Sequence, residues 1–197
     1  TFNRKSVYHF NKKPKIFIGL KNFPILNKLK PLKKKIILIN FGSVRDKSLI
    51  NKSILFLQKL KINKSYKILI ISNHFKRKHL SHSNIKNQVI YRNFVKNMDE
   101  IYRKTFLSIG SCGISLYEKC FYNIPCIVKC LAKNQYYNFK NFKAKACILD
   151  FDRVTNSKVD GGIYKKILKI KKNIKSNFDF KINKKHLTNL FKEIDEN

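Results

Sequence analysis

The residues with the clearest potential for chemistry lie at 106–135, FLSIGSCGISLYEKCFYNIPCIVKCLAKNQ. An apolar run at 106–109 breaks into a turn of small residues at 110–113, and a segment with helical spacing follows before a second apolar run. This order predicts a βαβ unit, in which the helix N-terminus offers backbone N–H groups and a positive dipole end to a phosphate. The stretch therefore predicts a nucleotide or another phosphorylated ligand at this turn.

Two side chains in the first turn of the predicted helix suit a nucleotide. Ser115 and Glu118 stand three residues apart and therefore share one face of the helix. A hydroxyl there can donate to a phosphate oxygen, and a carboxylate can accept from both hydroxyls of a ribose. The same Ser-x-x-Glu spacing is also that of a capping box, in which the two side chains only close the helix start. Both interpretations stay open from spacing alone, and they do not exclude one another.

Further residues follow in an order and spacing that are typical of one enzyme family. The set consists of Ile109, Gly110, Gly113, Ser115, Glu118, Ile124, Pro125, Ala132, Asn134 and Gln135. It resembles the C-terminal half of the UDP-sugar hydrolases of pseudaminic acid biosynthesis, which are similar in fold to the lipid II-forming N-acetylglucosaminyltransferase. The likeness extends more loosely over 19–150, where ILINFGS at 37–43 resembles the family's strand and glycine loop.

The resemblance implies how UDP would be held. The diphosphate would lie between the loop after the first strand and the small-residue turn, with Glu118 on the ribose. The turn after the third strand would hold the uracil through Phe94 and Val95, although Phe94 could instead fill the core. Asn134 and Gln135 would contact the sugar or its β-phosphate. The implied nucleotide-binding residues are Gly42, Ser43, Phe94, Val95, Gly110, Ser111, Gly113, Ser115 and Glu118.

The chain departs from the family pattern at several positions around this site. The departures are Ser43, Ile114, Leu116, Tyr117 and Lys133. They bear on the sugar more than on UDP, because Gly113, Ser115 and Glu118 are kept.

The resemblance implies no catalytic residue within this chain. In the hydrolases the base is a histidine of the N-terminal domain, and none of the five histidines here lies in a matching glycine-rich turn. The implied activity is release of UDP from a UDP-linked diacetamido-trideoxy sugar, by a longer protein of which this chain is part. The chain alone is expected to be inactive, and neither a cofactor nor a metal ion is implied.

Two alternatives to the hydrolase remain. The first keeps the fold and makes the chain the donor-binding half of a family 28-like, UDP-sugar-dependent glycosyltransferase. The second is a basic nucleic-acid-binding module without catalysis, which would bind DNA or RNA with a steep dependence on salt.

Composition favours a globular protein, at 43% hydrophobic residues, and gives weak support to a polyanion partner. The formal net charge of +33 would ordinarily indicate nucleic acid or an anionic membrane. However, only six of the 44 cations are arginine, and the lysines are spread over the whole chain. The charge is therefore interpreted as compositional drift, and nucleic acid is not the favoured partner.

Cysteine and histidine usage does not indicate a metal site or disulfides. The five cysteines lack a Cys-x-x-Cys pair and are expected to be small buried hydrophobes in a reducing cytosol. His74, His79 and His82 are irregularly spaced among cations, which favours a solvated loop. Because neither a signal peptide nor an apolar run of membrane-spanning length is present, the expected location is cytoplasmic without membrane insertion.

The elements that would position the site alternate between strands and helices. Short apolar runs predict buried strands at 35–40, 66–71, 88–91, 106–109, 126–130 and 146–150. Helical spacing predicts helices at 46–61, 98–104 and 135–143, and a further helix directly after the glycine turn. Two C-terminal helices are predicted near 164–174 and 184–194. The fold class is therefore α/β, a doubly wound parallel sheet (Rossmann-like), and the resemblance makes it the C-terminal half of a glycosyltransferase B-type fold.

The same reading divides the chain into two parts. Residues 1–33 form a basic, Pro-punctuated arm, expected to follow an N-terminal domain that is missing here. Residues 34–197 form the nucleotide-sugar-binding Rossmann-like domain with C-terminal helices.

Overall fold

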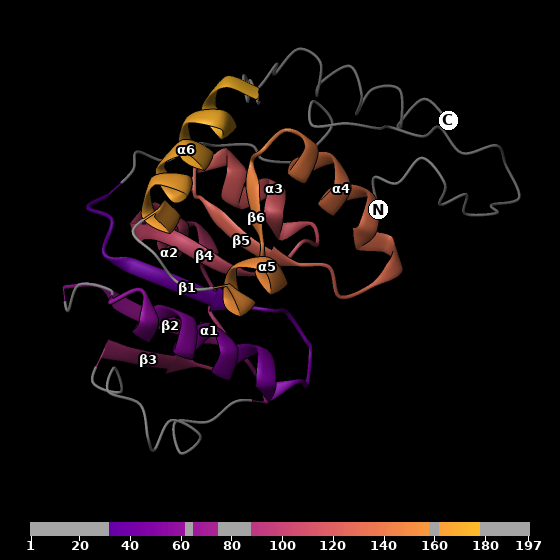
Figure 1. Cartoon of the computed structure of the whole chain (residues 1–197). Coiled ribbons are helices and arrows are strands. Elements are labelled where there is room, and N and C mark those ends of the chain that lie inside the picture. Colours follow the sequence, from indigo (N-terminus) through magenta and orange to yellow (C-terminus); the bar gives the residue numbers. More distant parts are fainter. Residues whose placement is uncertain (1–31, 62–64, 75–87, 158–161, 178–197) are drawn as a thin grey trace, which may run out of the picture.

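A computed structural model describes residues 32–61, 65–74, 88–157 and 162–177 of the chain (Figure 1). The predicted basic arm, except its last two residues, lies outside these ranges. So do the histidine-rich segment beyond His74 and the helix predicted near 184–194.

Six parallel strands form a single sheet in the order β3-β2-β1-β4-β5-β6. The strands are β1 (Ile36–Asn40), β2 (Lys67–Ile71), β3 (Val89–Arg92), β4 (Thr105–Ser111), β5 (Cys126–Lys129) and β6 (Ile148–Asp150). The central strand β1 reads IILIN, and its Ile37, Leu38 and Ile39 are fully buried. Burial on both faces explains the continuous apolar run, and each such side chain contributes roughly 1.5–3 kcal/mol relative to exposure. The predicted doubly wound sheet is confirmed.

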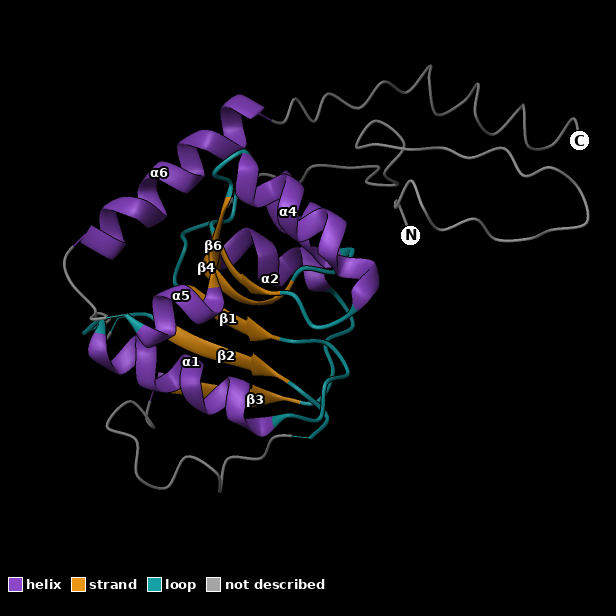
Figure 2. Ribbon diagram, turned by 45° about the vertical axis from the view of Figure 1, so that its right-hand side comes forward, coloured by secondary structure: helices purple, strands orange, loops and turns teal. Residues whose placement is uncertain are grey.

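Helices cover both faces of the sheet, so that the strands run between two helical layers (Figure 2). The helices are α1 (Lys47–Lys59), α2 (Met98–Lys104), α3 (Ser115–Phe121), α4 (Tyr136–Ala144), α5 (Phe151–Asn156) and α6 (Gly162–Asn177), with a 3₁₀ turn η4 (Lys133–Gln135). One buried cluster joins the sheet to α1 and α5, and the other joins it to α2, α3 and α4. Helix α6 contributes Ile163 and Ile167 to the first cluster and Ile170 and Ile174 to the second. Among the described residues no helix is long and apolar enough to cross a membrane.

The strand order reverses at β1. Strands β2 and β3 lie on one side of β1, whereas β4, β5 and β6 lie on the other. Asn40, the last residue of β1, pairs with Gly110 of β4. The loops after these two strands therefore leave the same edge of the sheet side by side, as predicted. In open α/β sheets this reversal at the carboxyl ends of the strands is where ligands bind.

Polar side chains set the starts of three helices. The Asp46 side chain accepts from the Ser48 N–H at 2.8 Å at the start of α1, and Asn97 accepts from the Glu100 N–H at 3.2 Å at the start of α2. Asp150 does the same for α5. Such caps satisfy N–H groups that the helix leaves unpaired, and each contributes about 1 kcal/mol.

Two details of the sequence prediction are wrong. The strand predicted at 106–109 continues through Gly110 and Ser111, so the turn contains only Cys112, Gly113 and Ile114 before α3 begins. Helix α5 was not predicted, because it follows β6 without a loop and is only six residues long.

Candidate functional site

A pocket of about 560 Å³ lies where the start of α2 meets α3. Its lining residues are Lys96, Asn97, Met98, Asp99, Tyr102 and Glu118. Lys96 and Asn97 precede α2, Met98, Asp99 and Tyr102 belong to α2, and Glu118 belongs to α3. The pocket thus contains the residue that the resemblance places on the ribose, and it begins one residue after Val95, which the resemblance places on the base.

Glu118 is fixed by a neighbour from another helix. The Tyr102 hydroxyl donates to Glu118 Oε2 at 2.9 Å. Burial, followed by the adjacent Glu118 carboxylate, raises the pKa of Tyr102 far above its ordinary value, so the phenol remains protonated and acts as the donor. The other oxygen of the carboxylate is left to interact with a ligand in the pocket.

The capping-box interpretation of Ser115 and Glu118 is wrong. The N-cap of α3 is Ile114, which has helical backbone angles and provides no side-chain cap bond. Ser115 is already the first residue of the helix, and Glu118 bonds Tyr102 instead of reaching back to the backbone. The pair is therefore not used to close the helix start.

The turn after β3 contains Phe94 and Val95, which precede the pocket-lining Lys96 in the chain. Phe94 is 77% exposed, so the alternative in which it fills the core is wrong. Val95 is half-buried and packs against the core cluster beneath α2. An exposed aromatic ring beside a pocket is a surface on which a nucleobase can stack.

The two glycines of β4 and its turn have different surroundings. Gly110 is buried within β4, and a Cβ there would clash with the carbonyl oxygen of Asn40 and lie 3.0 Å from its carbonyl carbon. A Cβ at Gly113 would meet only the Gln135 Nε2, at an ordinary 3.7 Å. Packing between β1 and β4 therefore explains Gly110, whereas Gly113 lies in the open turn next to the loop after β5.

Backbone donors of the β4 turn lead directly into α3. The first helical hydrogen bonds run from the Leu116 N–H to the Gly113 carbonyl and from the Tyr117 N–H to the Ile114 carbonyl, both at 3.0 Å. The N–H groups of Gly113, Ile114 and Ser115 precede these bonds and are the orphan donors of the helix start. Ser111 is buried as the last residue of β4.

The loop after β1 carries Gly42 and Ser43, both exposed. Gly42 has a φ of +72°, in the left-handed region, and its N–H donates to the Asn40 side chain at 2.7 Å. Glycine adopts this conformation without the steric cost of a side chain. Since Asn40 pairs with Gly110, this loop and the β4 turn are neighbours at the ligand edge.

Gln135 and Asn134 lie on the loop after β5. The Gln135 Oε1 accepts from the Leu131 N–H at 3.0 Å, and its backbone carbonyl lies 3.4 Å from the Cys112 Sγ. These contacts direct the amide nitrogen of Gln135 towards Gly113. Asn134 is exposed.

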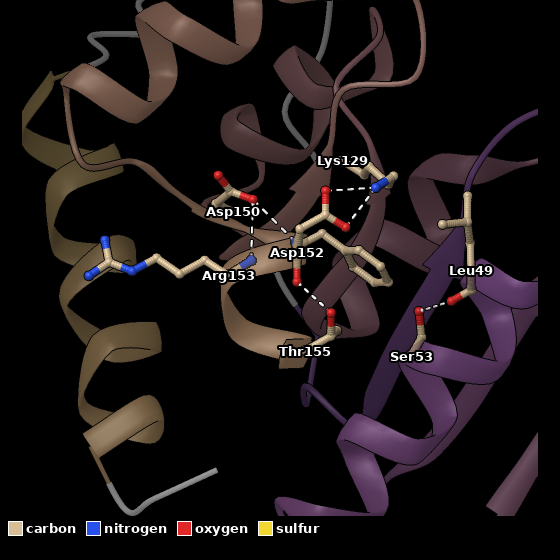
Figure 3. A network of polar contacts seen from close by, with 8 residues as sticks. Leu49, Ser53, Lys129, Asp150, Asp152, Arg153 and Thr155 are labelled. Carbon is tan, nitrogen blue, oxygen red and sulfur yellow. Dashed lines mark hydrogen bonds and ion pairs between the residues drawn. The ribbon is translucent and has the colours of Figure 1, made fainter. Parts of the chain in front are cut away.

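Two features of this edge had no signal in the sequence. One is the Tyr102–Glu118 hydrogen bond, since no spacing rule connects residues on separate helices. The other is an ion pair at the end of β5, where Lys129 Nζ lies 2.6 Å from both carboxylate oxygens of Asp152 on α5 (Figure 3). The pair is more than a quarter exposed on each side and adds at most about 1 kcal/mol of stability.

The cysteines are thiols, and four of the five are buried as expected, while Cys130 is half-buried. Burial raises the pKa of both Cys112 and Cys126 to about 12, so these thiols stay protonated and poorly nucleophilic. Within the described part of the chain, no three His, Cys, Asp or Glu residues gather in a way that could hold a metal ion.

A family model described as the glycosyltransferase family 28 C-terminal domain matches residues 36–196. That range contains every described strand and helix. No curated protein matches the chain significantly in sequence.

Solved structures of similar fold include three plant proteins. UGT71G1 of Medicago truncatula, complexed with UDP-glucose, has a TM-score of 0.50 and 17% identity over 74% of this chain and 35% of that one. UGT2 of Phytolacca americana, complexed with UDP-2fluoro-glucose and pterostilbene, has a TM-score of 0.52 and 15% identity, with coverage of 74% and 36%. A variant of Os79 from O. sativa, in complex with UDP, has a TM-score of 0.51 and 16% identity, again with 74% and 36%. At this identity the likeness concerns the fold, and the chain spans little more than a third of each of these proteins.

Proposed function

The chain belongs to the glycosyltransferase family 28 C-terminal domain family, and on this premise we propose that it is the donor-binding half of a UDP-sugar-dependent glycosyltransferase. In such a transfer an acceptor hydroxyl oxygen bonds to the anomeric carbon, and the bond from that carbon to the β-phosphate oxygen breaks. UDP leaves with the electron pair, and the hydroxyl proton passes to a base. A donor-binding half contributes UDP binding and stabilisation of the leaving group.

The observation that carries the proposal is the pocket between α2 and α3. The pocket is lined by a carboxylate, Glu118, that is held in place by Tyr102, and the exposed aromatic ring of Phe94 belongs to the turn just before the lining residue Lys96. In the proposed complex the uracil lies on Phe94 and against the backbone of Val95, and the ribose hydroxyls donate to Glu118. The occurrence of UDP or UDP-sugars in the three plant proteins of similar fold supports this choice of nucleotide.

The diphosphate and the sugar are then placed along the neighbouring loops. We assign the phosphates to the gap between the Gly42-Ser43 loop and the N–H groups at 113–115. The amide nitrogen of Gln135, next to Gly113, is a donor for the β-phosphate or the sugar, and Asn134 extends towards the sugar. A preorganised donor at a developing negative charge contributes about 3 kcal/mol to a transition state.

The second candidate is hydrolysis of a UDP-linked diacetamido-trideoxy sugar, in which water takes the place of the acceptor and UDP is released. The residues that favour it are Ala132, Asn134 and Gln135, which match the pattern of the pseudaminic acid hydrolases. The family match supports the transferase better, because the matching model is that of a glycosyltransferase domain.

Calorimetric titration of the 197-residue chain with UDP, ADP and CMP tests the proposal. We expect UDP to bind more tightly than the other two, since the backbone groups at Val95 would select the uracil base, whereas the ribose contact is common to all three nucleotides. Phe94→Ala should weaken UDP by about tenfold, the scale of a lost aromatic stack, without loss of stability. Leu55→Ala is the control, because Leu55 is another exposed apolar residue, on α1, at 55% exposure. Equal or absent heats for all three nucleotides would remove the proposal.

A further inference from the structure

A hydrogen bond joins the two segments that form the candidate nucleoside pocket. Tyr102 belongs to α2, and residues 96–99, at and just before the start of that helix, line the pocket on the proposed base side. Glu118 belongs to α3 and lines the pocket on the proposed ribose side. The 2.9 Å bond between the Tyr102 and Glu118 side chains connects these two sides.

Tyr102 is itself held rigidly. Its side chain is 2% exposed, and its ring packs on the ring of Tyr122 with centroids 5.8 Å apart. Burial raises the pKa of the phenol, so its hydroxyl donates across the physiological pH range. A rigid donor of this kind restricts a carboxylate to one orientation without any change of its own on ligand binding.

Restriction matters because a glutamate has several rotatable bonds. Ordering such a side chain when a ligand binds costs free energy, and an orientation fixed beforehand avoids that cost. The bond also occupies Oε2, which leaves Oε1 available to a ligand. The carboxylate is thereby both immobilised and made asymmetric before any nucleotide arrives.

We infer that Tyr102 is a positioning residue for ribose recognition: its hydroxyl orients Glu118 so that Oε1 accepts from the 2′-hydroxyl of a bound UDP. The inference rests on the proposed function and adds to it a determinant of ribose over deoxyribose. Tyr102 does not contact the nucleotide in this arrangement and acts only through Glu118.

The test compares UDP with 2′-deoxy-UDP on the full chain and on Tyr102→Phe. The phenylalanine keeps the buried ring and removes only the hydroxyl. We expect the preference of the wild-type chain for UDP over 2′-deoxy-UDP to fall by about tenfold in the variant, the scale of one hydrogen bond to a charged group. The affinity for 2′-deoxy-UDP should change little. A purely structural role of Tyr102 would lower stability and weaken both nucleotides alike.

Two further variants make the result specific. Tyr117→Phe is the matched control, because Tyr117 lies beside Glu118 on α3 and donates to Asn138 Oδ1 at 2.8 Å instead. It should leave the ratio of the two affinities unchanged. In a Glu118→Ala background, which removes the acceptor, Tyr102→Phe should have no further effect on that ratio.

Three outcomes decide between the inference and the proposed function. A reduced ratio in Tyr102→Phe, with the control unchanged, supports the inference. A ratio that stays constant or rises in Tyr102→Phe overturns it while leaving UDP binding as proposed. A wild-type chain that binds neither nucleotide overturns both.

Discussion

At the scale of single residues, Gly110 and Gly113 show that the same residue type can have different structural roles. They are three positions apart in one turn-like sequence, yet Gly110 lies inside β4 and Gly113 lies beyond its end. The clash of a Cβ at Gly110 with the Asn40 carbonyl means that the backbones of β1 and β4 can approach only because this residue has no side chain. Sequence spacing could not separate these roles, since the end of the strand depends on the partner strand.

We therefore expect Gly110→Ala to destabilise the domain and Gly113→Ala to leave its stability nearly unchanged. Overpacking at a buried site typically costs about 1–3 kcal/mol, while a substitution in ordinary contact stays within about 0.5 kcal/mol. Urea unfolding followed by circular dichroism measures both. Equal free energies of unfolding for the two variants would mean that β1 and β4 adjust to the added methyl group.

The ribose carboxylate illustrates what residue spacing can and cannot predict. The place of Glu118 near the start of α3 followed from its distance to Ser115 and from the turn before it. That Glu118 does not cap the helix could be seen only with Tyr102, which contacts Glu118 from another helix although it is 16 positions away. Phe94 was ambiguous for a similar reason, because its exposure depends on how the turn after β3 leaves the sheet.

At the scale of elements, the strands were predictable because burial on both faces leaves a continuous apolar run. The missed elements are short or follow another element without a loop, as α5 does after β6. Helix α3 also contains a buried lysine: Lys119 is only 1% exposed. The sequence predicts a lysine to face solvent, and only the packing of α3 against its neighbours reveals the burial.

The burial of Lys119 predicts how the free energy of unfolding depends on pH and on this side chain. Burial lowers the pKa of Lys119, although Cys126 and Glu118 oppose the shift. Because the folded pKa is below the unfolded value of about 10.4, the unfolded chain binds more protons between the two, and stability rises with pH over that interval. Lys119→Met keeps the length of the side chain and removes the ammonium, so it should raise the free energy of unfolding near neutral pH by about 1–4 kcal/mol.

Unfolding of wild type and Lys119→Met at two pH values would measure this effect. The advantage of the variant should shrink as the pH rises towards the unfolded pKa of about 10.4, since the stability of the wild type increases over that interval. Lys166→Met, at an exposed position of α6, serves as the control and should change stability little at either pH. A Lys119→Met protein that is less stable than wild type at neutral pH would mean that the ammonium has a favourable partner in the core.

At the scale of the whole molecule, the described residues form one six-stranded α/β unit. The loops after β1, β4 and β5 meet at a single edge of the sheet, and the exposed Phe94 and Ile114 lie on segments that leave that edge. The chain spans little more than a third of the plant proteins of similar fold. We therefore attribute donor binding to this chain and assign the acceptor and the base to a further part of the complete protein.

Charge at this scale is spread over the surface of the described residues. Helix α6 exposes six lysines on its outward face, Lys165, Lys166, Lys169, Lys171, Lys172 and Lys175. They surround an apolar stripe of four buried isoleucines, as expected for a solvated amphipathic helix. Such a field attracts any anion, UDP included, and this attraction weakens with added salt.

If this chain binds the donor and another part of the protein supplies the base, the 197-residue chain should bind UDP-sugars without turning them over. Transfer or hydrolysis needs a base within about 3 Å of the attacking oxygen. Three carboxylates of the described residues already have partners: Glu118 accepts from Tyr102, Asp152 pairs with Lys129, and Asp46 caps α1. Asp99 lines the pocket that we assign to the nucleoside, not to the sugar. Incubation with UDP-N-acetylglucosamine should therefore release no UDP above the uncatalysed rate, as measured by a coupled assay for UDP. The complete protein, or this chain supplemented with the remaining domain, should release it.

If the chain alone released UDP rapidly, and continued to do so after each of its five histidines was replaced, the base would lie within this domain. Our assignment of the base to another part of the protein would then be wrong.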